Sequence, residues 1–254
     1  MIITDTAVGH AVAVSHLTKT FPHGARTLVA LNDVSLEVQT GEFVCVVGAS
    51  GCGKSTLLNV LAGLDQPTTG DVKVDGRVAL MFQEAALLPW LTAAGNVELA
   101  LELRGVTRPE RKAMAHELLG RLHLEGFEKR MPHELSGGMK QRVALARALA
   151  QDADILLMDE PFASLDAITR DLLHDELVRL WTSTPLTVVF VTHNPREAVR
   201  LGDRVVVFTT RPGRVAHELK IDLPRPRNLD SPEIAVIASR ITDRLKEEMR
   251  TDVD

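Results

Sequence analysis

The run of residues 48–55 constrains the fold of this chain more than any other part of the sequence. It reads GASGCGKS and fits the pattern G-x-x-x-x-G-K-[ST] at every constrained position. The apolar stretch EFVCVV, residues 42–47, comes directly before it, and the helix-compatible stretch STLLNVLAGL begins at its last residue. A buried strand, a glycine-rich turn and a helix in this order are typical of α/β folds with a parallel sheet.

The residue types in this loop match the chemistry of phosphate binding. Glycines allow close approach and unusual backbone conformations, so that successive N–H groups point at phosphate oxygens, and the helix N-terminus adds its positive dipole end. Lys54 is expected to reach the β- and γ-phosphates of a nucleotide, and the Ser55 hydroxyl to bind Mg²⁺. Cys52 is interpreted as a small spacer in the loop, and Cys45 as a core residue.

The composition excludes several broad classes of protein. The chain has 254 residues, 45% hydrophobic and 25% charged, which is typical of a globular protein with a sizeable core. A net charge of −5 argues against an extended nucleic-acid-binding surface. The two cysteines provide neither a disulfide framework nor a zinc-ligand pattern. No apolar run approaches the roughly 20 residues of a membrane span, and the N-terminal MIITDTAVGH does not resemble a signal peptide.

Short apolar runs alternate with helical patterns along most of the chain. The runs at 42–47, 155–158 and 187–191 are almost continuously apolar, as in parallel strands covered by helices on both faces. Residues 11–17 and 34–38 alternate in polarity and predict an antiparallel sheet with one wetter face. The sequence therefore predicts a parallel sheet accompanied by an antiparallel β lobe.

The region between residues 92 and 150 contains no convincing strand and predicts a helical insertion. Within it, the stretch 109–123 begins with a proline in the first turn of a predicted helix. Its apolar side chains share one face of that helix: Met114, Leu118, Leu119 and Leu122. Near the C-terminus, DLPRPR at 222–227 is interpreted as a linker before a charged helix at about 232–250.

An acidic pair follows one of the predicted parallel strands. Asp159 and Glu160 come directly after the run 155–158, at a strand end where such folds place their phosphates. Asp159 is expected to hold Mg²⁺ indirectly, for example through water, and Glu160 to orient or deprotonate an attacking water. Acidic residues after a strand are often only a turn or a helix cap, but the upstream phosphate loop favours the functional interpretation.

His193 ends another apolar run. Asn194 and Pro195 behind it are typical of the N-cap and first turn of a helix. The imidazole is therefore expected at a strand–helix junction on the same sheet edge as Asp159. Either it has a structural role there, or it contacts the γ-phosphate or the attacking water.

Residues 135–142 read LSGGMKQR, and with the motifs above they resemble the nucleotide-binding subunits of ABC transporters, whose signature is L-S-G-G-Q. Gln83 in MFQEAALLPW resembles the Q-loop glutamine, Ser164-Leu165-Asp166 the D-loop, and His193 the switch histidine. The order and spacing also agree, with about 90 residues from the phosphate loop to the signature. The resemblance covers about 12–217, and Met139 stands where the family most often has Gln.

The resemblance implies a set of residues that bind ATP and Mg²⁺ and hydrolyse ATP. It implies Glu160 as the catalytic base, His193 as a γ-phosphate contact, and Gln83 as a sensor of Mg²⁺ and water. The metal ligands would be Ser55, Gln83 and Asp159. The nucleotide-binding residues would be Phe21, Gly48, Ala49, Ser50, Gly51, Cys52, Gly53, Lys54, Ser55, Thr56, Ser136, Gly137, Gly138 and Asp166.

The signature residues and Phe21 lie outside the phosphate loop, and each has its own argument. Ser136, Gly137 and Gly138 precede a helix of small residues, and the resemblance implies that their N–H groups face the ATP of a second copy. Two ATP molecules would then lie in a head-to-tail homodimer with two-fold symmetry. Because the chain has no tyrosine, Phe21 is the candidate for stacking on adenine, and the alternative is that it packs in the core or a loop.

Three stretches resemble the ATPases of nitrate, sulfonate, taurine and bicarbonate importers: FQEAALLPWLTAAGNVELAL, LDAITR and TRPGRVAHELKIDLPRPR. The implied protein is a peripheral ATPase on the cytoplasmic face of the membrane, which powers aliphatic sulfonate or similar import. Its implied partners are two permease subunits and, indirectly, an extracytoplasmic solute-binding protein, with no nucleic acid. The ATP-binding domain would span 12–243, with a helical subdomain at about 88–150 and a tail at 244–254.

Two other functional classes are weighed against this interpretation. Soluble ABC ATPases that act on chromosomes or ribosomes carry long coiled-coil insertions or two cassettes, and neither fits within this length. A small-molecule kinase with a phosphate loop does not explain the signature or Asp166. The apolar run around Trp90, directly after Gln83, is either buried core or an exposed groove for a short helix of the membrane subunit.

Overall fold

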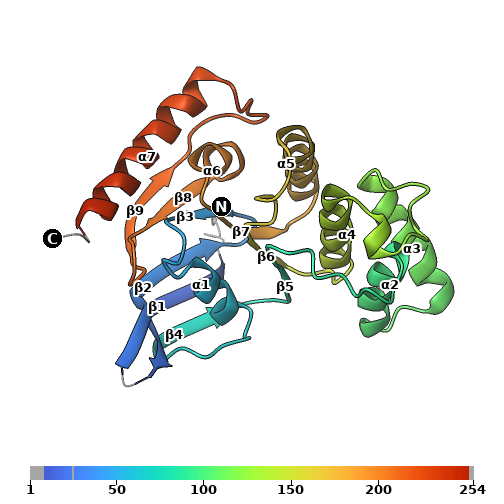
Figure 1. Cartoon of the computed structure of the whole chain (residues 1–254), viewed down its shortest axis with the longest axis horizontal. Coiled ribbons are helices and arrows are strands. Elements are labelled where there is room, and N and C mark those ends of the chain that lie inside the picture. Colours follow the sequence, from blue (N-terminus) through green and yellow to red (C-terminus); the bar gives the residue numbers. More distant parts are fainter. Residues whose placement is uncertain (1–8, 25, 252–254) are drawn as a thin grey trace, which may run out of the picture. The chain divides into compact units, whose positions relative to one another are not determined.

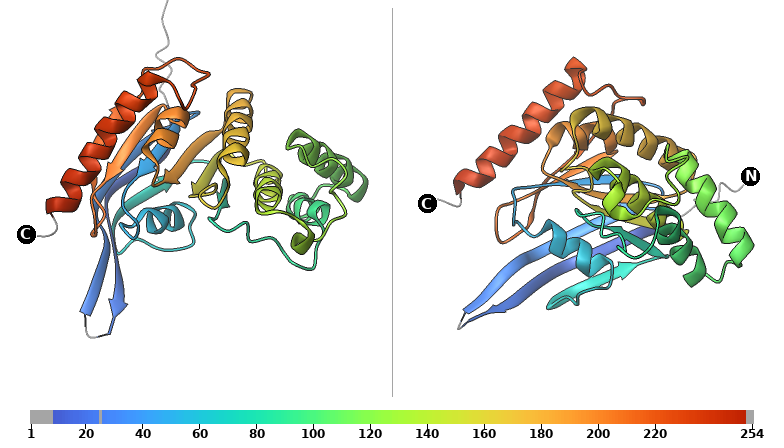
Figure 2. Two further views of the ribbon diagram at one scale, coloured as in Figure 1. Left: turned by 45° about the horizontal axis from the view of Figure 1, so that its top comes forward. Right: turned by 45° about the vertical axis from the view of Figure 1, so that its right-hand side comes forward.

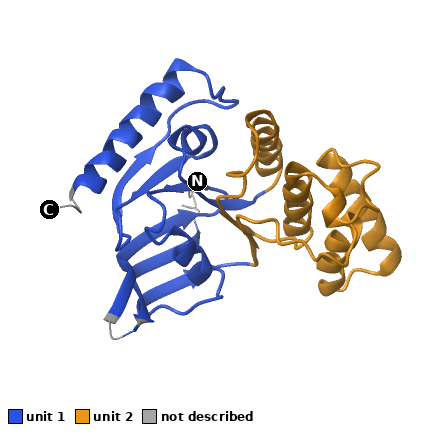
Figure 3. Ribbon diagram, in the orientation of Figure 1, with its two compact units in different colours: residues 1–76, 185–254 blue, residues 77–184 orange. Residues whose placement is uncertain are grey.

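The computed structural model describes residues 9–24 and 26–251. They form two compact units, unit 1 from residues 1–76 and 185–254, and unit 2 from residues 77–184 (Figure 3). Residues 1–8 of the N-terminal stretch MIITDTAVGH, which was examined for a signal peptide, and the last three residues of the predicted tail lie outside the described residues. None of the helices in the described ranges is long and apolar enough to cross a membrane.

Unit 1 contains a three-stranded antiparallel sheet in the order β2-β1-β4. Its strands are β1 (His10–His23), β2 (Arg26–Gln39) and β4 (Thr69–Val74). The predicted antiparallel sheet is confirmed, but β1 and β2 are longer than the alternating stretches that predicted them. The pairing of the two strands shifts between Val14 and Leu17, and His16 has a φ of 52°, so a bulge breaks the alternation inside one continuous strand.

The second sheet of unit 1 has the order β7-β3-β8-β9. Its strands are β3 (Phe43–Val47), β7 (Thr187–Thr192), β8 (Arg204–Phe208) and β9 (Val215–Lys220). Strand β3 is parallel to both β7 and β8, and β9 is antiparallel to β8. Every residue of β3 and β7 is buried, as their apolar runs predict.

Three helices complete unit 1. Helix α1 (Lys54–Leu61) lies against β2 and β4, and α6 (Pro195–Leu201) packs on β3, β7 and β8. Helix α7 (Pro232–Thr251) runs alongside α6 and β8 (Figures 1 and 2). The predicted C-terminal helix is therefore confirmed, and residues 244–251 of the predicted tail are its last turns.

Unit 2 combines a short parallel strand pair with helices. Strands β5 (Val78–Met81) and β6 (Ile155–Asp159) are paired in parallel. The helices are α2 (Ala93–Leu103), α3 (Arg108–Arg121), α4 (Gly137–Leu149) and α5 (Ala167–Thr182), with a 3₁₀ turn at Pro132–Glu134. Helices α2, α3 and α4 pack on one another (Figure 1), so the stretch predicted as a helical insertion is helical.

The stretch 222–227, interpreted as a linker, is instead bound tightly to the end of α6. Arg227 is buried and donates hydrogen bonds to the carbonyls of Val199 (2.7 Å), Gly202 (2.6 Å) and Leu223 (2.9 Å). Arg225 donates to Asp203 Oδ1 at 2.5 Å and to the Leu201 carbonyl at 2.6 Å. Burial of the Arg227 guanidinium lowers its pKa to about 10, which leaves it charged at neutral pH. The two arginines therefore supply the donors that the C-terminal carbonyls of α6 lack.

Replacing Arg227 with Met is expected to lower the free energy of unfolding by about 3 kcal/mol, because several buried carbonyls lose their donor. The measurement is chemical denaturation of the isolated chain. Arg240, an exposed residue of α7, provides the matched control, and Arg240→Met should leave stability unchanged. Equal stability of the two variants would show that the stretch 222–227 does not hold α6.

Candidate active site

The loop 48–53 follows β3 and leads into α1, as the sequence predicts. Lys54 is only 5% exposed, and its ammonium group donates to the carbonyls of Gly48 (2.9 Å) and Ala49 (3.0 Å). The positive charge is therefore held inside the curve of the loop. Ser55 and Ser50 are exposed, so their hydroxyl groups are accessible at the rim of the same loop.

Two glycines of the loop are required by its geometry. Gly53 has a φ of 106°, and a Cβ there would lie 2.7 Å from the Ala30 carbonyl oxygen. A Cβ at Gly48 would lie 2.7 Å from Cys52 Sγ. Side chains at these positions would fill or distort the curve, so the residues present fit a phosphate group.

Both cysteines are buried, which for Cys45 confirms the interpretation as a core residue. Burial raises the pKa of the Cys45 thiol well above its usual value, which keeps the thiol neutral within the sheet. Cys52, within the loop, is 1% exposed.

His193 lies at the same sheet edge as the phosphate loop. Residue Val47 of β3 is paired with Thr192 of β7, so the residues that follow, Gly48 and His193, leave neighbouring strands side by side. His193 is exposed, and Asn194 caps α6 by accepting from Arg196 N–H at 3.0 Å. The predicted strand–helix junction is confirmed. The buried Glu197 accepts a short hydrogen bond from the Thr192 hydroxyl and so holds the corner beside His193.

Phe21 lies near the end of β1 and is half-buried. The Lys19 ammonium lies 4.8 Å from the centre of its ring, and that ammonium also donates to Asp65 Oδ1 (2.5 Å) and the Gln66 carbonyl (2.8 Å). One face of Phe21 is thus covered by a fixed cation. Stacking of adenine on the other face stays a prediction.

In unit 2, the signature sequence begins α4. Ser136 is the N-cap and accepts from Met139 N–H at 3.3 Å, while Gly137 and Gly138 form the first turn. Ser136 and Gly137 are exposed, and a Cβ at Gly137 would meet nothing within 4 Å. A Cβ at Gly138 would lie 2.5 Å from Thr169 Cγ2 of α5, so glycine is needed for the close contact of the two helices.

The D-loop aspartate lies beside this contact. Asp166 is the N-cap of α5 and accepts from Thr169 N–H at 3.0 Å, and this hydrogen bond lowers the pKa of the Asp166 carboxyl. Since Thr169 also contacts Gly138, the structure brings the signature and the D-loop together within unit 2.

The acidic pair ends strand β6. Asp159 is its last residue, and Glu160 follows with a φ of 41°, a left-handed conformation that is uncommon for a residue with a side chain. Both side chains are partly exposed. Backbone strain of this kind concentrates at functional sites.

The segment around Gln83 is held by polar side chains that the sequence pattern did not reveal, two of them on α4. Gln141 of α4 donates to the Gln83 carbonyl at 2.8 Å, and Arg147 of α4 donates to the carbonyls of Ala85 (3.0 Å) and Ala86 (2.8 Å). Burial lowers the pKa of Arg147, and the two carbonyls are its hydrogen-bonding partners.

Asn96 holds the rest of that segment. It is fully buried, accepts from Leu88 N–H at 2.8 Å, and donates to the carbonyls of Leu88, Leu91 and Thr92 at 3.0–3.3 Å. The available signal was a polar residue on the buried face of α2, between Ala93 and Val97. Such a residue needs hydrogen-bonding partners, and a neighbouring loop supplies them.

Trp90 lies within the segment that Asn96 holds, and it is 69% exposed. The alternative that it belongs to the buried core is therefore wrong. Leu88 of the same segment lines a cavity of about 440 Å³ together with Leu99, Ala100 and Leu103 of α2. The same cavity is also lined by Arg77, Arg104 and Arg147, so its lining combines apolar and basic side chains, and Leu103 is 82% exposed.

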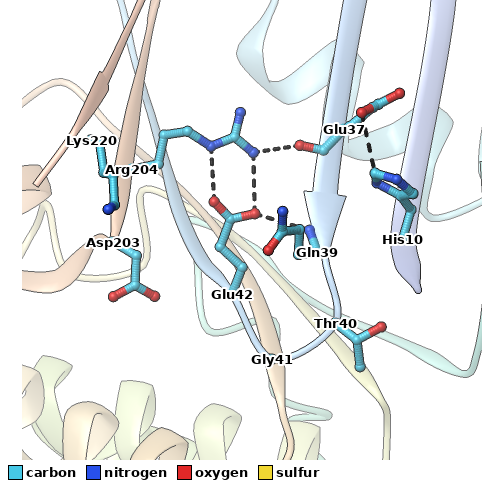
Figure 4. Close-up of a pocket in the computed structure, with 9 residues that line it drawn as sticks. All are labelled: His10, Glu37, Gln39, Thr40, Gly41, Glu42, Asp203, Arg204 and Lys220. Atoms are coloured by element: carbon cyan, nitrogen blue, oxygen red, sulfur yellow. Dashed lines mark hydrogen bonds and ion pairs between the residues drawn. The ribbon is translucent and has the colours of Figure 1, made fainter. Parts of the chain in front are cut away.

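A second and larger cavity, of about 520 Å³, lies in unit 1 (Figure 4). Arg204 crosses it to Glu42 with hydrogen bonds of 2.8 and 3.1 Å, and also pairs with Glu218. Glu42 and Arg204 stand where the parallel strands β3 and β8 begin, whereas the phosphate loop follows the carboxyl end of β3. The cavity is thus at the wrong sheet edge for a nucleotide site, and its charges hold strands together.

Comparison with known proteins supports the interpretation of the sequence motifs. The model of the ABC transporter family matches residues 31–163. A nitrate import ATP-binding protein of Synechocystis is 45% identical, covering 83% of this chain and 82% of that protein. An aliphatic sulfonates import ATP-binding protein of Bacillus licheniformis is 42% identical, covering 88% and 89%. The chain belongs to the ABC transporter ATP-binding family.

The fold agrees with this membership. An ATP-binding cassette solved as a dimer in a post-hydrolysis state with ADP and Pi has a TM-score of 0.77 and 37% identity, covering 84% of this chain and all of that one. The chain is thus an ABC ATPase with the cassette fold, as the motifs imply.

The described residues contain no cluster of three or more His, Cys, Asp or Glu side chains that suits a metal ion. Mg²⁺ in nucleotide sites usually binds through one or two protein oxygens together with substrate phosphates. The exposed Ser55 hydroxyl at the rim of the phosphate loop fits such a role.

Proposed function

We propose that this ABC ATPase powers the import of a small anionic solute of the nitrate, sulfonate or taurine type through a separate transmembrane permease. The observation that carries the proposal is its identity of 42–45% to import ATPases for nitrate and aliphatic sulfonates. It would act peripherally on the cytoplasmic face of the membrane, on two permease subunits. An extracytoplasmic binding protein would deliver the solute, and nucleic acid has no role.

Affinity purification from membranes tests this proposal against an ABC ATPase that acts on chromosomes or ribosomes. Co-purification with a protein of many membrane spans supports an importer subunit. Co-purification with ribosomes or DNA, and with no membrane protein, would overturn the proposal.

Within the proposed function, each motif has a chemical role. Lys54 and the loop N–H groups bind the phosphates of ATP. Ser55, Gln83 and Asp159 would hold Mg²⁺, whose charge would offset that of the phosphates. Glu160 takes the proton of the attacking water, and His193 contacts the γ-phosphate. The domain boundaries at 12–243 and the helical subdomain at about 88–150 belong to the same proposal.

We also propose that the signature faces the ATP of a second copy. The exposed Ser136 and Gly137, at the N-terminus of a helix of 13 residues, support this. Asp166, next to the signature contact, would lie at the same interface. A related cassette is dimeric, which supports a homodimer for this chain.

The segment after Gln83 is the proposed contact with the permease. Trp90 is exposed, and the cavity lined by Leu88, Leu99 and Leu103, with Arg104 and Arg147 in its lining, would receive a short cytoplasmic helix of the permease. Because Gln141 fixes the Gln83 carbonyl, a movement at the nucleotide would reach this surface through the segment itself.

Replacing Glu160 with Gln is expected to lower ATP hydrolysis about 10²–10⁴-fold, the usual effect of losing a positioned base. ATP binding should persist, since the proposed phosphate and Mg²⁺ contacts come from other residues. Unhydrolysed ATP should then hold two copies together, which gel filtration with ATP detects. Glu117→Gln, at an exposed position of α3, is the control. Near wild-type hydrolysis by Glu160→Gln would remove Glu160 from the mechanism.

Replacing Ser136 with Arg is expected to abolish hydrolysis while one chain still binds ATP. The long side chain would occupy the space of the opposing γ-phosphate and block the dimer. Binding of a fluorescent ATP analogue and the hydrolysis rate are measured on the same sample. Ser239→Arg, at an exposed position of α7, is the control. Loss of nucleotide binding by the monomeric variant would contradict a site shared between two copies.

Replacing Trp90 with Ala should leave the thermal midpoint and basal hydrolysis unchanged, because the side chain is 69% exposed. Assembly with the permease should weaken by about 2 kcal/mol or more, as for a truncated hot-spot tryptophan. Titration of the permease with each variant measures this. Leu64→Ala, at a position 64% exposed in unit 1, is the control. Full-strength assembly by Trp90→Ala would exclude Trp90 from the docking surface.

A further inference from the structure

The stretch TRPGR, residues 210–214, follows β8 and lies directly on the phosphate loop of unit 1. Arg211 donates two hydrogen bonds to the carbonyl oxygen of Gly51, from Nε at 3.0 Å and from Nη2 at 2.9 Å. The residues are 160 positions apart, and Arg211 is outside the phosphate-loop pattern. None of the roles proposed above uses this contact.

The turn that carries Arg211 is itself fixed to the loop and to β2. Gly213 donates to the Ala30 carbonyl and accepts from Asn32 N–H, both at 3.0 Å. A Cβ at Gly213 would lie 2.1 Å from the Cys52 carbonyl oxygen, so the backbone of the turn touches the backbone of the loop. The Thr209 hydroxyl donates to the Pro212 carbonyl at 2.8 Å and accepts from Arg214 N–H at 3.0 Å, which closes the turn.

We propose that Arg211 is a positioning residue of the phosphate loop, which fixes the peptide between Gly51 and Cys52 in the orientation that binds phosphate. In a planar trans peptide, the C=O and the following N–H point in opposite directions. With the Gly51 carbonyl held by the guanidinium, the N–H of Cys52 points to the other side. There it donates a long hydrogen bond of 3.3 Å to the Ala49 carbonyl, which also accepts from the Lys54 ammonium, and an anion bound inside the loop would take the place of that carbonyl as acceptor.

Glycine at position 51 is what makes this contact possible. Its φ is 77°, and a Cβ would lie 3.0 Å from Arg211 Nη2. Without Arg211, the peptide beside such a glycine has other accessible orientations, because glycine is the residue least restricted in φ and ψ. The arginine therefore lowers the conformational cost of arranging the loop around an anion.

Charge contributes in the same direction. Arg211 places a permanent cation against the outer side of a loop proposed to bind polyphosphate. The side chain is exposed, so salt screens this attraction, whereas the two hydrogen bonds to one carbonyl depend on the fork geometry of the guanidinium. Arg214, exposed in the same turn, carries the same charge, and the described residues show no hydrogen bond from its side chain.

The test compares Arg211→Met, Arg211→Lys and Arg214→Met by titration with a fluorescent ATP analogue and by steady-state hydrolysis. For Arg211→Met we expect the dissociation constant and KM to rise about 5- to 20-fold, with kcat within about twofold of wild type. Arg211→Lys should recover part of the affinity, because one ammonium keeps the charge but not both hydrogen bonds. Arg214→Met, with the same change in net charge, should bind as wild type does.

The inference rests on the proposed nucleotide-binding role of the loop, and Lys54→Ala separates the two. If Lys54→Ala binds the analogue normally, the proposed function of the loop fails. If Lys54→Ala loses binding while Arg211→Met binds as wild type does, the positioning role alone is overturned. Equal loss of affinity in Arg211→Met and Arg214→Met would likewise overturn it in favour of general electrostatics. Thermal melts without nucleotide establish that each variant is folded.

Discussion

The register of three parallel strands is the constraint on which the phosphate site of this ABC ATPase depends. Val47 of β3 is paired with Thr192 of β7 on one side and with Val207 of β8 on the other. Since backbone hydrogen bonds fix this alignment, the three segments that follow leave the sheet at one edge. They carry the phosphate loop, His193 and Arg211. A slip of one residue in either pairing would move each side chain to the opposite, equally buried face of the sheet and would displace these groups from one another.

Helix α4 has the corresponding role in unit 2. Its exposed N-terminus presents Ser136 and Gly137, and its body holds the segment after Gln83 through Gln141 and Arg147. One rigid element thus carries the signature and fixes the backbone that leads to Trp90. For the proposed transport cycle, this gives a physical connection between the interface with a second copy and the surface for the permease.

The sequence was most informative where a segment's local pattern matches its environment. The runs at β3, β6 and β7 are apolar because both faces of each strand are covered, and they were predicted correctly. The continuity of β1 through His16 was not predictable, because the bulge reverses the alternation that marks a strand. The interpretation of the stretch 222–227 as a linker was wrong, because the Pro-Arg-Pro-Arg pattern is also typical of linkers. Only the tertiary structure shows that Arg227 binds the end of α6. Arg211 was missed for the same reason, since its partner, Gly51, is distant in sequence.

The buried polar side chains explain how the exposed functional groups are held in place. A buried donor or acceptor without a partner costs about 1–3 kcal/mol, so each such side chain must find backbone or side-chain partners nearby. Here those partners lie beside the predicted site residues: Lys19 beside Phe21, Lys54 in the phosphate loop, Gln141 at Gln83, Asn96 around Trp90, and Thr192 with Glu197 next to His193. Loops fixed in this way can leave Ser136, His193 and Trp90 exposed to their proposed partners, because the support comes from behind. In this fold, a polar residue on an otherwise apolar face therefore indicates which neighbouring loop must be kept rigid.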